Sequence, residues 1–253
     1  MPFAQVRDLR LYYELHGDGQ PLVRVNGALD TIESDWLQHL PDFAARYRVL
    51  AYDHRGHGRT DNPSGHFSGY DQLAEDLLTL LDVMGISRPH LCGFSDGGIT
   101  LIAFALRWPH RVRSLILAGA QYTNDRRTLA QLDKMTPERI EARHPAWAEQ
   151  LVRLHDAAHE PGYWKTLLRQ MRPFWRVQPD FRLDQLALID APVLLVAGDG
   201  DHFGNLEQQV AMRGVIRAAQ LCVAPDAGHF VMRDQPELFR LVTMAFLEKC
   251  AND

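Results

Sequence analysis

The chain of 253 residues has the composition of an ordinary globular protein, with 46% hydrophobic residues, 23% charged residues and a formal net charge of −5. Charges of both signs are scattered, so no like-charge block indicates a nucleic-acid or membrane-binding surface, and neither a signal-peptide pattern nor an apolar run of roughly 18 residues is present. We therefore expect a cytoplasmic protein that acts on a small molecule, with no nucleic-acid partner and no membrane partner. The sequence makes no prediction of the oligomeric state.

Short β-rich runs alternate with longer amphipathic stretches along the chain. The first two runs, Leu9 to Leu15 and Leu22 to Gly27, are joined by a glycine-rich turn and are predicted to form a hairpin. The later strands are nearly continuous apolar runs, as expected for a sheet covered on both faces, and lie within residues 47–53, 88–94, 112–119, 191–199 and 219–225. Helices are predicted over residues 70–85, 96–109, 205–216 and 236–250. This alternation predicts right-handed βαβ units and a mainly parallel sheet of the α/β class.

Residues 122–190 interrupt the alternation, because this segment has helical patterns and no convincing strand. We expect it to form a helical cap over one end of the sheet, with residues 1–121 and 191–253 forming the core domain. Aromatic residues at helical spacing are usually buried in a core, but a cap also roofs the pocket beneath it. The candidate substrate contacts in the cap are therefore Trp147, Trp164, Phe174 and Trp175.

The pentapeptide from Gly93 to Gly97, GFSDG, fits the pattern G-x-S-x-G and lies between a predicted strand and a predicted helix. A sharp turn at that place exposes the Ser95 hydroxyl at the C-terminal edge of the sheet, where open α/β sheets bind ligands. A phosphate-binding loop is the alternative interpretation, but the chain has neither a G-K-[ST] ending nor a G-x-G-x-x-G spacing. Ser95 is therefore the predicted nucleophile.

A serine hydroxyl needs a neighbouring base, and the base needs an acid that orients it. After a nucleophile in this kind of turn, the acid comes first along the chain and the histidine second. His229 fits the base because it lies in a loop just past the last predicted strand and before the last predicted helix, so it can lean back over the sheet toward Ser95. Asp199 and Asp201 both fit the acid. Asp201 is favoured because a loop side chain can turn toward the imidazole, whereas Asp199 at the strand end is suited to shaping the turn.

The remaining cysteines and histidines indicate no further chemistry. The three cysteines are dispersed and have no C-x-x-C spacing, so we expect reduced thiols at Cys92, Cys222 and Cys250. His54 and His57 have no further cysteine, histidine or carboxylate at a metal-ligand spacing, so no metal site is predicted.

Five blocks of sequence resemble the α/β-hydrolase fold superfamily in order and spacing, and they span the chain: YYELHGDGQPLVRVNG, YDHRGHGRTDNP, LCGFSDGG, VLLVAGDGDH and DAGHF. The resemblance implies an eight-stranded, mostly parallel sheet, a helical cap after the sixth strand, and hydrolysis with no metal or organic cofactor. It also implies an oxyanion hole formed by the backbone N–H groups of Ala28 and Asp96, where one donor is worth about 10² to 10³ in rate. Many relatives have a histidine where this chain has Asn26, which we expect to shape the loop.

Asp96, directly after the predicted nucleophile, raises an electrostatic question. A carboxylate about 5 Å from a developing oxyanion would destabilise it by roughly 3 kcal/mol at an effective dielectric constant of 20. Asp96 is therefore expected either to be paired or solvated away from the oxyanion, or to bind a cationic group of the substrate. The stretch from Gly93 to Gln121 resembles amino-acid-ester hydrolases similar to valacyclovir hydrolase, in which an aspartate at this place is associated with the α-amino group of the substrate.

These features predict a serine hydrolase that cleaves a small carboxylic ester through an acyl-serine intermediate, with an α-amino-acid ester as one candidate. A lactonase or enol-lactonase, or a carbon–carbon bond hydrolase, could share the same triad and cap. A non-catalytic ligand-sensing receptor on the same fold is the alternative from another class. Haloalkane dehalogenases and epoxide hydrolases are disfavoured, because their nucleophile is an aspartate where this chain has Ser95.

Overall fold

The computed structural model describes residues 2–34 and 37–251. Its centre is an eight-stranded sheet with the strand order β1-β2-β4-β3-β5-β6-β7-β8. The strands are β1 (Phe3–Val6), β2 (Leu9–His16), β3 (Gln20–Val25), β4 (Tyr47–Tyr52), β5 (His90–Phe94), β6 (Ser114–Ala118), β7 (Val193–Gly198) and β8 (Ala219–Ala224). Every strand pair from β4·β3 to β7·β8 is parallel, and only the pairs β1·β2 and β2·β4 are antiparallel. The prediction of an eight-stranded, mostly parallel sheet is confirmed.

The hairpin predicted between the first two strand runs is wrong. β2 pairs with β1 and β4, whereas β3 pairs with β4 and β5, so β4 separates the two runs. The glycine-rich turn lies directly against the segment that enters β4. A Cβ at Gly17 would lie 2.0 Å from the Ala44 carbonyl oxygen, and one at Gly19 would lie 2.7 Å from that of Arg46. The true hairpin joins β2 to β1, a strand that the sequence pattern did not indicate, through a turn with Arg7 at φ 55°.

Helices cover both faces of the sheet, and successive side chains of the strands alternate between two cores. In β6, for example, Leu115 and Leu117 belong to one core, whereas Ile116 and Ala118 belong to the other. The first core contains side chains from α2 (Tyr70–Val83), α3 (Asp96–Arg107), α8 (Leu183–Leu186) and α9 (Leu206–Val215). The second contains side chains from α1 (Leu40–Ala44), α10 (Val231–Asp234) and α11 (Pro236–Ala251). Burial on both faces explains the continuous apolar runs of these strands.

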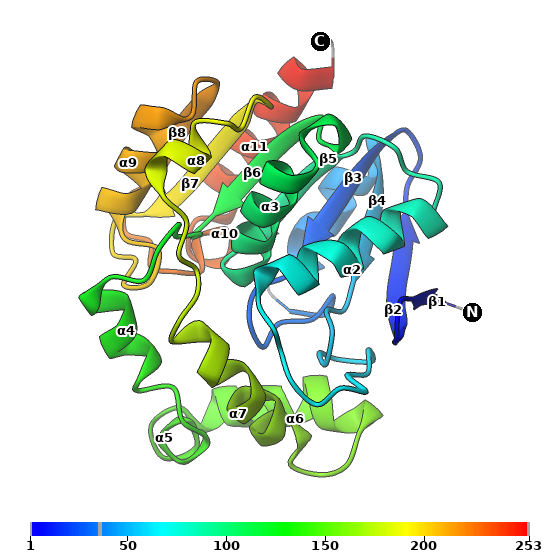
Figure 1. The fold of residues 1–253 in the computed structure, drawn as a ribbon, viewed down its shortest axis with the longest axis vertical. Helices are drawn as coiled ribbons and strands as arrows, with labels where there is room; N and C mark the ends of the chain where they lie inside the picture. Colours follow the sequence, from blue (N-terminus) through cyan, green and yellow to red (C-terminus); the bar gives the residue numbers. More distant parts are fainter. Residues whose placement is uncertain (1, 35–36, 252–253) are drawn as a thin grey trace.

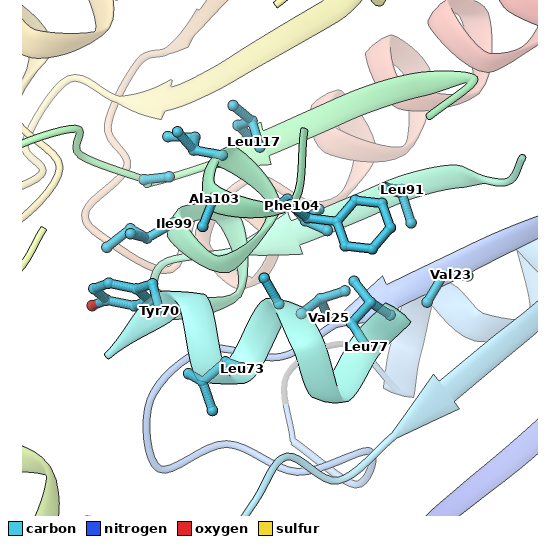
Figure 2. Packing of buried hydrophobic residues seen from close by; sticks show 14 of the residues in the cluster. Val23, Val25, Tyr70, Leu73, Leu77, Leu91, Ile99, Ala103, Phe104 and Leu117 are labelled. Carbon is cyan, nitrogen blue, oxygen red and sulfur yellow. The ribbon is translucent and has the colours of Figure 1, made fainter. Parts of the chain in front are cut away.

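The packing of α2 against α3 holds the N-terminus of α3 above the sheet. Figure 2 shows side chains of both helices meeting over the strands, and those labelled there are at most 3% exposed: Val23, Val25, Tyr70, Leu73, Leu77, Leu91, Ile99, Ala103, Phe104 and Leu117. Burial of each large apolar side chain contributes about 1.5 to 3 kcal/mol. The start of α3 is therefore anchored by a closely packed core on one side.

The segment from residue 122 to residue 190 is helical, as predicted, and follows β6. It contains α4 (Arg126–Leu132), α5 (Pro137–Arg143), α6 (Pro145–His155), α7 (Tyr163–Trp175) and α8. Figure 1 shows α4 to α7 gathered at one end of the molecule, whereas α8 lies near α9. We call residues 122–190 the cap segment; its exact limits as a separate unit stay a prediction. Within the described residues, none of the helices combines the length and the apolar character needed to cross a membrane.

Candidate active site

Ser95 occupies a strained turn between β5 and α3. Its backbone has φ 49° and ψ −122°, in a region that residues other than glycine rarely adopt. A Cβ at Gly93 would lie 2.7 Å from the Gly97 carbonyl carbon, and a Cβ at Gly97 would lie 2.2 Å from the Val25 carbonyl oxygen. The helix can approach the strands this closely only because both flanking residues lack a side chain. The Ser95 N–H donates to the Ala118 carbonyl oxygen at 2.8 Å, which fixes the turn.

Ser95, His229 and Asp201 form one hydrogen-bonded chain. His229 Nε2 lies 2.9 Å from Ser95 Oγ, and His229 Nδ1 lies 3.0 Å from both carboxylate oxygens of Asp201. Asp201 is buried and also accepts hydrogen bonds from the N–H groups of Phe203 and Gly204, at 2.8 and 3.1 Å. The structure thus brings together the three side chains that the sequence predicted as nucleophile, base and acid.

The competing aspartate makes a different contact. Asp199 accepts a hydrogen bond from the Ala227 N–H at 3.2 Å and so joins the end of β7 to the loop before His229. This is the turn-shaping contact expected of a strand-end residue. No hydrogen bond joins Asp199 to His229 among the described residues.

The negative groups around His229 change its proton affinity. Burial works to lower the pKa of His229, but Asp201, with smaller effects of Asp30 and Asp96, raises it above the ordinary value of 6.5. For Asp201, burial opposes ionisation, but His229 and the two N–H donors hold its pKa below the ordinary carboxyl value. Asp201 is therefore ionised at neutral pH and can stabilise a protonated imidazole.

The backbone N–H groups predicted to bind an oxyanion belong to residues that line the same cavity as Ser95 and His229. Asp96 is the first residue of α3, where N–H groups have no partner within the helix. Within residues 2–34 and 37–251, neither the Asp96 N–H nor the Ala28 N–H donates a hydrogen bond to a backbone carbonyl oxygen. Both donors are thus available to a bound carbonyl oxygen.

Asn26 lies outside the cavity and holds the loop in shape. It is fully buried, its Nδ2 donates to the Tyr52 carbonyl oxygen at 2.9 Å, and its own carbonyl oxygen accepts from His54 Nε2 at 2.9 Å. The structure thus places Asn26 where the sequence analysis expected a shaping residue. His54 belongs to no metal-ligating cluster, since the described residues contain no group of three or more histidine, cysteine, aspartate or glutamate side chains that could hold a metal ion.

The Asp96 carboxylate connects three parts of the chain. One oxygen accepts from the Tyr70 hydroxyl of α2 at 2.9 Å, and the other accepts from Trp175 Nε1 of α7 at 2.7 Å. The carboxyl group is buried, and burial raises its pKa to about 6 although both hydrogen bonds and His229 act to lower it. The sequence left two arrangements open for Asp96, a carboxylate paired within the protein and one that binds a cationic substrate group. The structure shows the carboxylate paired within the protein.

A cavity of about 700 Å³ lies between the sheet edge and the cap segment. Its lining includes Ser95 and His229, and two of the four predicted cap aromatics, Trp147 and Trp175, also border it. The other two predicted aromatics, Trp164 and Phe174, are buried in the first hydrophobic core and are absent from the lining. The cavity is large enough for a small organic molecule.

Sequence reasoning missed several residues of the cavity, among them Tyr70, Gln121, Asn124, Met135 and Phe203. Gln121 and Asn124 lie in the segment between β6 and α4, and polar residues after a parallel strand are a signal that could have been used. Tyr70 and Met135 carry no such signal, because Tyr70 begins the helix α2 and Met135 lies in the connection between α4 and α5.

The chain is similar to known hydrolases in sequence and in fold. The model of the α/β hydrolase fold family matches residues 20–236. Two curated relatives are 28% identical: the 2-hydroxy-6-oxo-2,4-heptadienoate hydrolase of Pseudomonas putida, over 91% of this chain and 90% of the relative, and the 3-oxoadipate enol-lactonase 2 of Acinetobacter baylyi, over 96% and 95%. The solved meta-cleavage product hydrolase CumD of Pseudomonas fluorescens has a TM-score of 0.84 at 22% identity, covers 98% of both chains, and shows the same fold.

The close contact at Gly97 leads to a stability prediction. Gly97→Ala should lower the free energy of unfolding by about 3 kcal/mol, because the added Cβ would overlap the backbone of β3. Urea unfolding followed by circular dichroism measures the change. The matched control is Gly214→Ala in α9, where no atom beyond the adjacent backbone of the same helix lies within 4 Å of the added Cβ. This control should keep stability or raise it by about 0.5 to 1 kcal/mol. Equal effects of the two substitutions would contradict the close approach of α3 to the strands.

Proposed function

This chain belongs to the α/β-hydrolase fold family, and from that premise we propose that it is a serine hydrolase of small carboxylic esters that works through an acyl-serine intermediate. The observation that carries the proposal is the continuous hydrogen-bonded chain from Ser95 through His229 to Asp201 at the edge of a substrate-sized cavity. Each of the three side chains follows the C-terminal end of a parallel strand. The order along the chain is the one expected for this kind of nucleophile.

In the proposed mechanism Ser95 Oγ attacks the ester carbonyl carbon, and His229 Nε2 accepts the hydroxyl proton. The resulting oxyanion accepts hydrogen bonds from the backbone N–H groups of Ala28 and Asp96, and Asp201 stabilises the imidazolium. His229 then gives the proton to the departing alkoxide, which leaves as an alcohol. A water molecule, deprotonated by His229, attacks the acyl group, and the proton returns to Ser95 Oγ as the carboxylic acid leaves.

Lactone hydrolysis is a second candidate, supported by the 28% identity to an enol-lactonase. The chemistry is the same, except that the alkoxide stays attached to the acyl group. Carbon–carbon bond hydrolysis is a third candidate, because the relative from Pseudomonas putida is named for a substrate that carries a keto group and a carboxylate. A panel of open-chain esters, lactones and such ketones would rank the three reactions by kcat/KM.

We do not extend the proposal to an α-amino-acid ester. Both oxygens of the Asp96 carboxylate already accept hydrogen bonds from Tyr70 and Trp175, and the relatives described above are named for other substrates. Binding of a substrate ammonium group at Asp96 stays a prediction of the sequence. A receptor that binds the same ligands without turnover is the alternative that the kinetic test below separates from an enzyme.

Removal of the nucleophile should abolish turnover while leaving the cavity in place. Ser95→Ala is expected to reduce kcat for p-nitrophenyl acetate by about 10⁶, because the residual rate comes only from binding and the oxyanion donors. Steady-state release of p-nitrophenol measures the loss. Retention of most activity in this variant would exclude Ser95 as the nucleophile, and absence of turnover in the wild type would favour the receptor.

The pH dependence of kcat/KM should report the protonation of His229. Activity requires the neutral imidazole, so it falls as the pH drops through a pKa that lies above the ordinary value of 6.5. Asp96→Asn removes a nearby negative charge that raises this pKa, so the acidic limb should move to lower pH. The asparagine retains the backbone N–H. It can also accept from Trp175 and donate to the Tyr70 hydroxyl oxygen, so the hydrogen bonds need not be lost.

Asp199→Asn is the matched control for this pH profile. It removes the same charge from an exposed residue that contacts a loop N–H instead of His229, and its effect is screened by solvent. The acidic limb of this control should coincide with that of the wild type. An equal shift in both variants, or no shift in Asp96→Asn, would contradict the electrostatic coupling of Asp96 to His229.

A further inference from the structure

Leu29, which directly follows the proposed oxyanion donor Ala28, has an unusual backbone conformation. Its φ is 58°, in the left-handed region that favours glycine, although its side chain is fully packed at 1% exposure. A residue with a side chain in such a conformation costs about 1 to 3 kcal/mol, and this cost is met only where the surroundings determine the backbone. The contacts that hold Leu29 therefore decide the shape of the loop at the proposed oxyanion hole.

Two buried histidines hold the two polar backbone groups of Leu29. The Leu29 N–H donates to His57 Nε2 at 3.1 Å, and the Leu29 carbonyl oxygen accepts from His155 Nε2 at 3.0 Å. His57 belongs to the loop after β4, whereas His155 is the last residue of α6 in the cap segment. The exposed fractions of His57 and His155 are 2% and 0%. Three segments far apart along the chain thus meet at one residue, Leu29.

In each histidine, the hydrogen bond made by Nδ1 determines whether Nε2 carries a proton in its contact with Leu29. His57 Nδ1 donates to the Arg55 carbonyl oxygen at 2.9 Å, which leaves Nε2 as the acceptor for Leu29. His155 Nδ1 accepts from the Gly58 N–H at 2.9 Å, which leaves the proton on Nε2 for donation to Leu29. Both rings are therefore neutral. Burial supports this state, since it lowers the pKa of His155 to about 4 and that of His57 well below its ordinary value.

The conformation of Leu29 bears directly on the neighbouring donor. Ala28 and Leu29 share a peptide plane, and the Leu29 N–H contact to His57 fixes that plane on the C-terminal side of Ala28. On the other side, the Asn26 carbonyl oxygen is held by His54. Ala28 lines the cavity between these two fixed points. An oxyanion donor must be oriented before the reaction, because reorientation during the reaction would cost part of its benefit.

We propose that His57 and His155 are positioning residues of the oxyanion hole, which hold Leu29 in its left-handed conformation and thereby aim the Ala28 N–H at the substrate carbonyl oxygen. This role rests on the function proposed above. Since His155 comes from α6, the cap segment contributes to the orientation of a transition-state donor in addition to roofing the cavity. Neither histidine touches the substrate in this role.

An isostere pair at position 155 separates the two contacts of that ring. Asparagine places its amide near the position of imidazole Nδ1, and glutamine places its amide near the position of Nε2. His155→Asn can keep the contact to the Gly58 N–H but loses the one to Leu29, and kcat should fall about 10-fold to 100-fold with little change in KM. His155→Gln can still donate to Leu29 and should keep kcat within about threefold of the wild type, since the oxyanion donor stays oriented.

His159→Asn is the matched control in the same segment. His159 donates from Nε2 to the Gly58 carbonyl oxygen at 3.1 Å, so it joins the cap segment to the same loop without contacting Leu29. Its kcat should equal that of the wild type. If the cap segment acted only by its attachment to the loop at Gly58, this control would lose as much activity as His155→Asn.

A second readout uses phenylboronic acid, which forms a tetrahedral adduct with a reactive serine. Its Kd should rise in His155→Asn by the same factor by which kcat falls, and in His155→Gln it should stay within about threefold of the wild-type value. This measurement needs no turnover, so it separates a failure of the proposed function from a failure of the positioning role. A wild type that neither hydrolyses esters nor binds the boronic acid contradicts the proposed function, whereas an active wild type with equal kcat and Kd in both variants contradicts the positioning role.

Position 57 provides an independent pair if the variants at position 155 do not fold, as judged by thermal unfolding. His57→Gln keeps an acceptor for the Leu29 N–H, and His57→Asn removes it. The asparagine variant should again lose about 10-fold to 100-fold in kcat relative to the glutamine variant. Equal kcat values for this pair would overturn the proposal.

Discussion

The close approach of α3 to the strands at Ser95 is the constraint on which the candidate site depends. With no side chain at Gly93 or Gly97, the helix begins directly above β3 and β5, and Ser95 takes a conformation that places its hydroxyl within reach of His229. The same geometry leaves the first N–H of the helix, that of Asp96, without an internal partner. One tight turn therefore supplies both the candidate nucleophile and a candidate oxyanion donor. The core between α2 and α3 (Figure 2) holds the turn in place.

Two hydrogen bonds join the cap segment to the two segments that carry the proposed oxyanion donors. Trp175 of α7 donates to the Asp96 carboxylate, and His155 of α6 donates to the Leu29 carbonyl oxygen. The first contact holds the side chain of a residue that is itself a proposed oxyanion donor, and the second holds the residue next to the other proposed donor, Ala28. Polar groups buried without partners are costly, so these hydrogen bonds favour one position of the cap segment over others. The orientation of the two proposed oxyanion donors therefore depends on the cap segment as well as on the core domain.

The parts of the fold and the site that follow local rules could be predicted from the sequence. Ser95, His229 and Asp201 were identified because each follows a strand end, and strand ends are recognisable from apolar runs. The order of β2, β4 and β3 was not recognisable, because a glycine-rich turn between two strands indicates a hairpin whether or not a third strand enters between them. For His155, the two hydrogen-bond partners lie 97 and 126 positions away along the chain, so no local pattern marks it.

The aromatic residues of the cap segment show why the sequence could not predict which side chains line the cavity. Phe174 and Trp175 are neighbours in α7, and successive residues of a helix point about 100° apart, so a shift of one position decides which ring meets the cavity. Trp175 lines the cavity, whereas Phe174 packs against Phe67 and Tyr70. The helical pattern places both rings on a buried face, but only tertiary packing separates a roofing residue from a core residue.

The proposed mechanism requires that Ser95 becomes acylated during turnover. Incubation with p-nitrophenyl acetate, acid quenching during the first turnover and peptide mass spectrometry would locate the acyl group. The account predicts one acetyl group, on the peptide that contains Ser95, and none on that peptide in Ser95→Ala. Hydrolysis without any trapped acyl group, or an acetyl group on another residue that persists in Ser95→Ala, would contradict it.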